Sequence, residues 1–240
     1  MKLSRRRILG VARKEVSDLR RNGNVVYAMA ILPAVFAVEP LIEAFRVSAR
    51  AAVLLHQEHT LIYMLAIPTM VPAALASYSI VGERIQGTLE PLLAAPLLES
   101  ELVLGKALAV FVPSVAVSYF LFGIYIAILE LFAAPAVTAA VVQVPEVVVQ
   151  VIFTPLLVVW STWLAMAISS RSRDVRAASQ ASIVASLPTV AVSLLIAFNV
   201  IPADLKVALG FGLGLFVVDR VGWRVVTALV DRERLVSSSR

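Results

Sequence analysis

The chain has 240 residues, of which 60% are hydrophobic and only 15% are charged, and its mean hydropathy is +0.91. This composition excludes an ordinary water-soluble globular domain and predicts an integral membrane protein. The net charge of +5 would suit nucleic-acid binding, but the placement of the cations argues for a membrane topology instead. The absence of cysteine excludes disulfides and thiolate metal sites.

The length accommodates about six membrane-spanning helices of about 20 residues each, with short connections. We therefore predict an all-α integral membrane protein in which residues 1–240 form a single transmembrane domain. The expected order is an amphipathic helix (1–22), spans one and two (25–81), a polar loop (82–101), spans three to six (102–227) and a charged tail (228–240). The individual spans are expected at residues 25–38, 61–81, 102–132, 147–169, 180–201 and 207–226.

Residues 1–22 combine an apolar helical face with eight Lys and Arg residues. Ile8, Ala12, Val16 and Leu19 recur at helical spacing, and most of the cations lie opposite them. This pattern predicts an amphipathic helix that lies flat in the membrane interface, with its cations toward lipid headgroups. Nucleic acid is the disfavoured partner for this segment.

Lys and Arg are distributed unevenly over the predicted connections. If both termini are cytoplasmic, 18 of the 21 Lys and Arg lie on the cytoplasmic side, and only Arg46, Arg50 and Lys206 lie outside. The positive-inside rule therefore predicts cytoplasmic termini and a cytoplasmic loop at residues 82–101.

Two of the predicted external connections have an unusual composition. His56 and His59 flank a glutamate, but their spacing matches no zinc motif, so we expect a solvated helix end and no metal site. Residues 133–146 are apolar and bounded by prolines. A partly immersed cap over an exit path and a simple interfacial loop are both compatible with this segment.

Asp219 and Arg220 are an ionisable pair in the last predicted span. If the helix continues to about residue 226, both lie in the inner half of the membrane, where charges usually face a protein interior or a water-filled cavity. If the helix ends at Val218, Asp219 is already in water. The sequence is compatible with either.

The loop between the second and third spans carries the most specific pattern in the chain. Gly87 is suited to end the incoming helix, because glycine adopts the left-handed conformation without strain. Thr88 is a good N-cap, and Glu90 favours the positive end of a new short helix that must end before Pro96. This helix has an apolar face, which predicts docking onto another surface. Its apolar residues are Leu89, Leu92 and Leu93.

This stretch resembles the pattern of ATP-binding-cassette (ABC) type-2 permeases, which have the type V exporter fold. The matching residues are Glu83, Arg84, Gly87, Thr88, Leu89, Glu90, Leu93, Pro96, Gly105 and Lys106. Ile85 and Glu99 depart from the pattern. The resemblance implies that the loop holds a cytoplasmic coupling helix, which sits in a groove of a separate ATPase subunit. By this resemblance, the ATPase-docking residues are Glu83, Arg84, Gly87, Thr88, Leu89, Glu90, Leu92 and Leu93.

The chain carries no nucleotide-binding or catalytic motif of its own. Gly105 and Lys106 do not belong to a phosphate-binding loop, because Ala107 follows them and the upstream glycine is missing. The resemblance therefore implies a permease subunit that is not an enzyme and has no cofactor, with ATP and Mg bound by the partner ATPase. The expected partners are cytoplasmic ABC ATPase subunits, a second permease copy or paralogue, and the lipid bilayer of a prokaryotic cytoplasmic membrane.

The resemblance implies that the function is ATP-driven export. The mostly apolar spans suggest a lipophilic or amphipathic substrate, such as a drug, lipid or peptide. A first alternative is an ABC-type membrane subunit that serves the assembly or maturation of an extracytoplasmic system. A second is an ATP-independent carrier or an intramembrane metalloenzyme, which the scarcity of ionisable groups in the spans disfavours.

Overall fold

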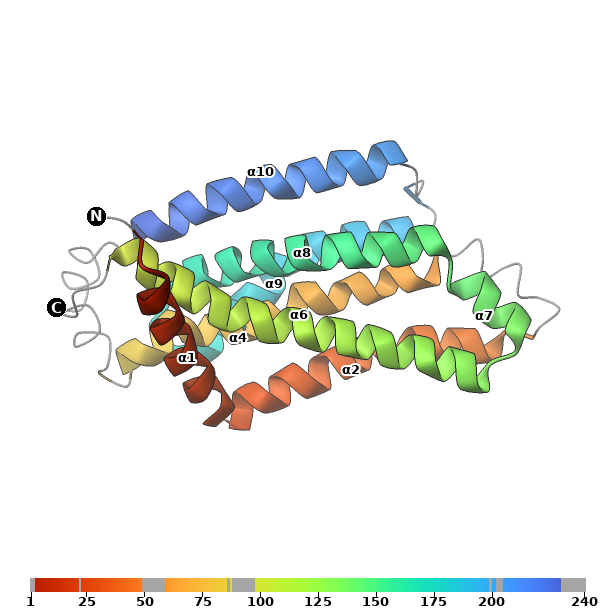
Figure 1. The fold of residues 1–240 in the computed structure, drawn as a ribbon, viewed down its shortest axis with the longest axis horizontal. Helices are drawn as coiled ribbons and strands as arrows, with labels where there is room; N and C mark the ends of the chain where they lie inside the picture. The colour runs from red at the N-terminus through yellow and green to blue at the C-terminus, as the bar shows by residue number, and fades with distance from the viewer. Residues whose placement is uncertain are drawn as a thin grey trace.

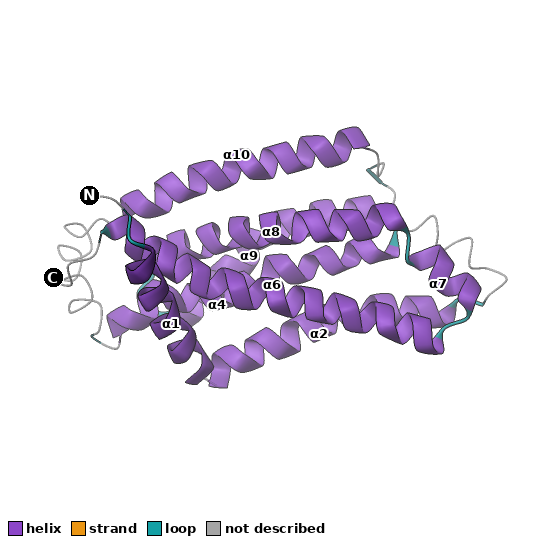
Figure 2. Ribbon diagram, viewed as in Figure 1, coloured by secondary structure: helices purple, strands orange, loops and turns teal. Residues whose placement is uncertain are grey.

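The structure is a computed structural model, and it describes residues 3–21, 23–48, 59–85, 87, 98–198, 200–201 and 205–229. Within these ranges the chain is all-α, as predicted, with helices joined by short loops and no strand (Figure 2). The helices are α1 (Arg5–Arg21), α2 (Gly23–Arg46), the 3-10 helix η2 (Thr60–Leu65), α4 (Ala66–Ile85), α6 (Glu99–Phe132), α7 (Pro135–Val141), α8 (Val144–Arg171), α9 (Val175–Ala197) and α10 (Leu205–Leu229).

The long helices form an elongated bundle, and α1 runs across one end of it (Figure 1). The short helix α7 lies at the opposite end. Helix α4 lies at the centre and contacts α2, α6, α8 and α9. The segment Thr60–Glu83, which covers most of α4, has a hydrophobic window that is 94% buried inside the protein. Of the four apolar segments given below, this one is therefore the most completely surrounded by other helices.

Four helical segments in the described part are long and apolar enough to cross a membrane. They are Thr60–Glu83, Glu99–Phe132, Val144–Arg171 and Val175–Ala197. The second to fifth predicted spans correspond to these segments. The first and sixth correspond to α2 and α10, of 24 and 25 residues, and their membrane crossing is part of the proposal below.

Several predicted boundaries are wrong. Helix α2 continues through Pro40 to Arg46, although we expected the first span to end at Val38, or just beyond it if Pro40 and Leu41 are included, and an external connection to follow. Its buried face consists of small residues and prolines, so packing against the bundle outweighs the usual effect of proline in a helix. These residues are Pro33, Ala37, Pro40 and Ala44.

Three other boundaries also differ from the prediction. Residues 133–146 contain the helix α7 and the first turn of α8 instead of a continuous loop. Helix α9 begins at Val175, before the predicted residue 180, because the Asp174 carboxylate caps it by accepting a hydrogen bond from the Ala177 amide at 3.0 Å. Helix α10 continues to Leu229, so the alternative in which this helix ends at Val218 is wrong.

Helices α4 and α8 run side by side in the same direction and are joined by serine hydroxyls. The Ser169 hydroxyl donates to the Ser77 carbonyl at 2.8 Å and accepts from the Val81 amide at 3.1 Å. Eight residues earlier in both helices, the Ser161 hydroxyl donates to the Thr69 carbonyl. In a bilayer the hydrophobic effect does not hold helices together, so close packing and such bonds fix the register of α4 against α8.

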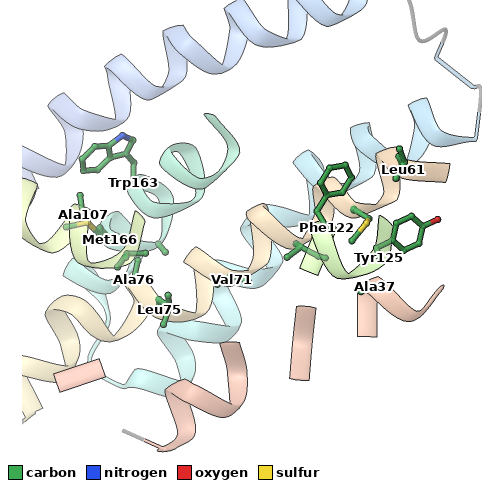
Figure 3. Packing of buried hydrophobic residues seen from close by; sticks show 14 of the residues in the cluster. Ala37, Leu61, Val71, Leu75, Ala76, Ala107, Phe122, Tyr125, Trp163 and Met166 are labelled. Atoms are coloured by element: carbon green, nitrogen blue, oxygen red, sulfur yellow. The ribbon is translucent and has the colours of Figure 1, made fainter. Parts of the chain in front are cut away.

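Figure 3 shows part of one cluster of buried apolar side chains, whose labelled members lie mostly in two groups along the bundle. Near the α1 end, Trp163 and Met166 of α8 pack with Ala107 of α6 and Ala76 of α4. Toward the other end, a second group joins α2, η2 and α6. Its labelled members are Ala37, Leu61, Phe122 and Tyr125. This core holds the helix ends that form the site described next.

Candidate functional site

A buried lysine lies at the centre of the candidate site, near the start of α6. The side chain of Lys106 is only 2% exposed, yet its ammonium group donates to three acceptors. These are Glu15 Oε1 of α1 at 2.7 Å, Glu83 Oε2 of α4 at 2.6 Å and the Ser79 carbonyl oxygen at 2.6 Å. Because a lysine ammonium has three N–H donors, every donor of Lys106 has a partner.

Lys14 completes this ion cluster, which we define as Lys14, Glu15, Glu83 and Lys106. The half-exposed Lys14 Nζ lies 3.1 Å from Glu83 Oε1. Two cations therefore balance two carboxylates in a largely buried place, which is the condition under which buried charges are tolerated. The cluster joins α1, α4 and α6.

The environment of the cluster shifts the pKa values of its two α1 members. Burial raises the pKa of the Glu15 carboxyl; Lys106 opposes this rise, whereas the nearby Glu83 carboxylate adds to it. For Lys14, burial lowers the pKa, but the attraction and hydrogen bond of Glu83, together with the attraction of Glu15 and Asp18, outweigh burial, so the net direction is upward. The lysine therefore remains charged beside Glu83 well above neutral pH.

Gly105 allows α1 to approach α6 closely enough for these contacts. A Cβ atom at residue 105 would lie 2.6 Å from both Cβ and Cγ1 of Val11 and 3.0 Å from the Ile8 carbonyl oxygen. Real side chains do not tolerate such distances, so only glycine fits here. Gly105 therefore allows the close packing of α1, and the adjacent Lys106 binds the Glu15 carboxylate of that helix.

Glu101 forms a second connection between α1 and the start of α6. Its carboxylate accepts from the Ser4 amide at 2.7 Å and from the Leu98 amide at 3.1 Å, and Arg7 Nη1 lies 3.5 Å away. A carboxylate suits this place, because the first turn of a helix exposes unpaired N–H groups and carries partial positive charge. Glu101 thus fixes the start of α1 on the start of α6.

Of the predicted ATPase-docking residues, the structure describes the side chain of Glu83 and the backbone of Gly87. Glu83 is buried in the ion cluster and binds residues of its own chain. Gly87 follows the end of α4 with φ of +67°, which confirms the prediction that it takes the left-handed conformation. The side chain of Arg84 lies outside the described residues, as do Thr88, Leu89, Glu90, Leu92 and Leu93.

Sequence reasoning singled out Glu83, Gly105 and Lys106 but not Glu15 or Glu101. A signal for Glu15 was present, because it lies one turn after Val11 on the apolar face of an otherwise basic amphipathic helix. A carboxylate on a face that becomes buried needs a cation as partner, because an unpaired buried charge is costly. No comparable signal identifies Glu101, whose main partner is the Ser4 backbone.

Asp219 and Arg220 do not act as a pair. Asp219 is 9% exposed, and its Oδ1 has no hydrogen-bond partner among the described residues, whereas Arg220 is exposed. Adjacent helical residues point about 100° apart. One turn further on, Gly222 lies against Trp163 of α8, where an added Cβ would be 2.9 Å from the Trp163 Cβ. Asp219 therefore lies on the packed side of α10.

The opposite end of the bundle holds a histidine–carboxylate pair and an apolar cavity. His59 Nδ1 lies 2.8 Å from Glu146 Oε1, so His59 is not the solvated residue that we expected, and His56 lies outside the described residues. The described residues contain no group of three or more His, Cys, Asp or Glu that could hold a metal ion.

A cavity of about 290 Å³ lies between η2, α8, α9 and α10. Ser193 is the polar exception in a lining that includes Ile62, Phe153, Ile196 and Phe211.

These features define the class of the protein: an all-α chain with several helices that could cross a membrane and an ion-paired helix across one end. No model of a known protein family matches the chain, and no curated protein matches it. The functional argument therefore rests on the residues themselves.

Proposed function

We propose that the chain is the membrane-spanning permease subunit of an ATP-driven exporter of the ABC type-2 kind. In this proposal α2 and α10 are the first and sixth of six spans, both termini are cytoplasmic, and the host is a prokaryotic cytoplasmic membrane. Separate ATPase subunits bind ATP and Mg, and a second permease copy or paralogue completes the transporter. The resemblance of residues 81–106 supports the family, and the distribution of Lys and Arg supports the orientation.

The observation that carries the proposal is the contact of Lys106 with Glu83 at 2.6 Å. These two residues lie on opposite sides of the predicted coupling segment, 23 positions apart. Their contact joins the end of α4 to the start of α6, the two helices that flank the segment. A partner that grips the loop therefore acts on α4 and α6 together.

The same contact extends the effect to α1. Glu15 shares the Lys106 ammonium with Glu83, and Glu101 binds the Ser4 backbone. Movement of the loop is thus transmitted to three helices through short charged hydrogen bonds, which are stronger and more directional than apolar contacts. Helix α4 then carries the movement into the bundle, because Ser169 and Ser161 fix it against α8.

The apolar cavity between η2, α8, α9 and α10 supports a transported substrate that carries an apolar group. Its lining is apolar except for Ser193, and the Phe153 and Phe211 rings stack beside it at 5.6 Å. Apolar pockets with few polar groups bind ligands largely by desolvation of apolar surface. A drug, lipid or peptide with a hydrophobic portion fits this description.

The first experiment tests the topology, for which the cysteine-free chain is convenient. A single cysteine introduced by Thr88→Cys should react with an impermeant maleimide only from the cytoplasmic side, whereas Arg50→Cys should react only from outside. Labelling of residue 88 from outside would contradict the proposal.

The second experiment tests coupling in proteoliposomes that also contain an ATPase subunit, to be identified by co-purification with the chain. Leu92→Pro should abolish transport and stimulated ATP hydrolysis while leaving membrane insertion intact, and Leu92→Met is the matched control. Normal transport by a stably inserted Leu92→Pro protein would exclude the docking role.

A membrane subunit for assembly or maturation of an extracytoplasmic system would share the coupling loop and the ATPase. Both functions predict the same topology and the same effect of Leu92→Pro on ATP hydrolysis. They differ in whether ATP hydrolysis moves a lipophilic compound across the proteoliposome membrane. An ATP-independent carrier would instead transport without any ATPase.

A further inference from the structure

Helix α1 carries a row of arginines that the ion cluster does not use. Arg6, Arg13 and Arg20 are all exposed, and none of them has an ion-pair partner in the part of the chain that the structure describes. Residues seven apart in an α-helix differ by only about 20° in direction and by about 10.5 Å along the axis. The three guanidinium groups therefore form one stripe along the helix, which we call the arginine stripe.

The arginine stripe lies opposite the face by which α1 docks. The docked face contains the buried Val11 and Glu15 and the half-buried Leu19, which packs against the core. The sequence predicts a helix in the membrane interface with its cations toward lipid headgroups, and the structure packs the apolar face of this helix on α6. The cationic side of α1 therefore points away from the helices on which α1 packs.

The position of α1 favours lipid headgroups as the occupant of the stripe. Helix α1 runs across the end of the bundle, where the apolar helices α4, α6 and α8 begin or end (Figure 1). Its outward face is thus at the level at which a surrounding bilayer presents its phosphates. Leu9, which is 52% exposed, lies between Arg6 and Arg13 on the same face. An apolar side chain among guanidinium groups suits the boundary between headgroups and acyl chains better than it suits a nucleic acid.

We propose that the arginine stripe is a binding site for the phosphates of anionic phospholipids in the leaflet at this end of the bundle. Guanidinium groups bind phosphate oxygens through paired hydrogen bonds, which ammonium groups cannot reproduce. The bound lipid also stabilises the docked position of α1, because the Glu15 carboxylate of the same helix accepts from the Lys106 ammonium beside Glu83. Anionic lipid thereby strengthens the connection of α1 to α4 and α6. The proposal requires no ATPase and stands apart from the proposed transport function.

The experiment uses the full-length chain in detergent, titrated with fluorescent phosphatidylglycerol or phosphatidylcholine. The variant is the triple change Arg6→Gln, Arg13→Gln and Arg20→Gln. Each cation near an anionic membrane surface contributes about 1 kcal/mol, so its dissociation constant for phosphatidylglycerol should rise on the order of 100-fold. The matched control is the triple change Arg171→Gln, Arg173→Gln and Arg176→Gln, which removes three exposed cations at the same end of the bundle. The control should bind phosphatidylglycerol like the wild type.

A second measurement locates the effect in α1. In vesicles of phosphatidylcholine with phosphatidylglycerol at 7:3, amide exchange in α1 should be slower than in pure phosphatidylcholine vesicles, and the stripe variant should lose this difference. Equal exchange in both vesicles for the wild type would overturn the proposal, as would an equal loss of affinity in the control variant. Displacement of phosphatidylglycerol by a short oligonucleotide at equal charge concentration would assign the stripe to a soluble polyanion instead. Unchanged melting temperatures in phosphatidylcholine show that the variants fold.

Discussion

Replacement of Lys106, the cation that both carboxylates of the ion cluster share, is the sharpest test of the cluster. In Lys106→Met the side chain keeps much of its length, but Glu15 and Glu83 lose the partner that lies 2.7 and 2.6 Å away. Both carboxylates are largely buried, and Lys14 alone cannot neutralise both. Removing one partner of a buried ion pair typically costs about 3–5 kcal/mol. We expect a loss of this size in the free energy of unfolding.

A double-mutant cycle separates the ion pair from other effects of the substitution. Adding Glu15→Gln to Lys106→Met leaves one carboxylate, Glu83, opposite one cation, Lys14, so the charge is balanced again. The double variant should therefore be more stable than Lys106→Met alone. The coupling energy should lie in the range of about 0.5–3 kcal/mol found for residues in contact.

The measurement is unfolding of the purified chain by increasing mole fraction of dodecyl sulfate in mixed micelles, followed by circular dichroism. Hydrogen exchange of the folded protein shows where stability is lost. The loss of protection should be largest in α1, because Lys106 holds that helix through Glu15. A Lys106→Met protein within about 0.5 kcal/mol of the wild type would refute the claim that the cluster holds α1 on the bundle. So would a double variant that is less stable than both single variants.

Three further predictions follow from the helix contacts. Gly105→Ala should lower the free energy of unfolding by about 1–3 kcal/mol, because the added Cβ would lie 2.6 Å from Val11. The matched control is Gly123→Ala on the same helix, whose Cβ meets open space. Melted under the same conditions, this control should be as stable as the wild type or more stable. Folding raises the pKa of Lys14, and the resulting stability is fully present below the ordinary lysine pKa of 10.5. This stability is lost as the pH rises through the pKa of Lys14 in the folded protein, so the melting temperature should fall in alkali. The fall should be less steep in Lys14→Arg, because arginine keeps its charge. Ser169→Ala should cost about 1 kcal/mol in the same unfolding assay, since it removes bonds between α4 and α8, whereas Ser182→Ala, whose hydroxyl bonds within α9, should cost little.

The helices were largely predictable because apolar composition and length suffice to recognise a membrane helix. Their ends were not, because side-chain capping and tertiary packing decide them. Asp174 extends α9 at its start through one hydrogen bond to the Ala177 amide. Pro40 does not end α2, because a face of small residues packs on the bundle. Gly87 was predictable, because the left-handed conformation at a helix end is a local property of glycine.

The candidate site was only partly predictable, because its members come from three distant segments. Local reasoning identified Glu83, Gly105 and Lys106 as unusual residues beside the loop but assigned Glu83 to an outside partner. The partner of Glu83 within the chain is Lys106, and only the packing of α4 against α6 brings the two together. Glu15 joins them because Gly105 lets α1 approach to the distance at which a carboxylate reaches Lys106.

The burial of Glu83 changes what a coupling mechanism can require of this end of the bundle. A carboxylate already bonded to Lys106 and Lys14 contributes little attraction to an outside partner, because opening the cluster would leave buried charges unpaired. Docking of an ATPase would then depend on the apolar face of residues 89–93, and the cluster would transmit the movement. Binding and transmission are therefore separable. Leu92→Pro should weaken ATPase binding, whereas Lys106→Met should leave binding intact and lower the amount of substrate moved per ATP hydrolysed. Equal loss of ATPase binding in both variants would show that the two functions share the same residues.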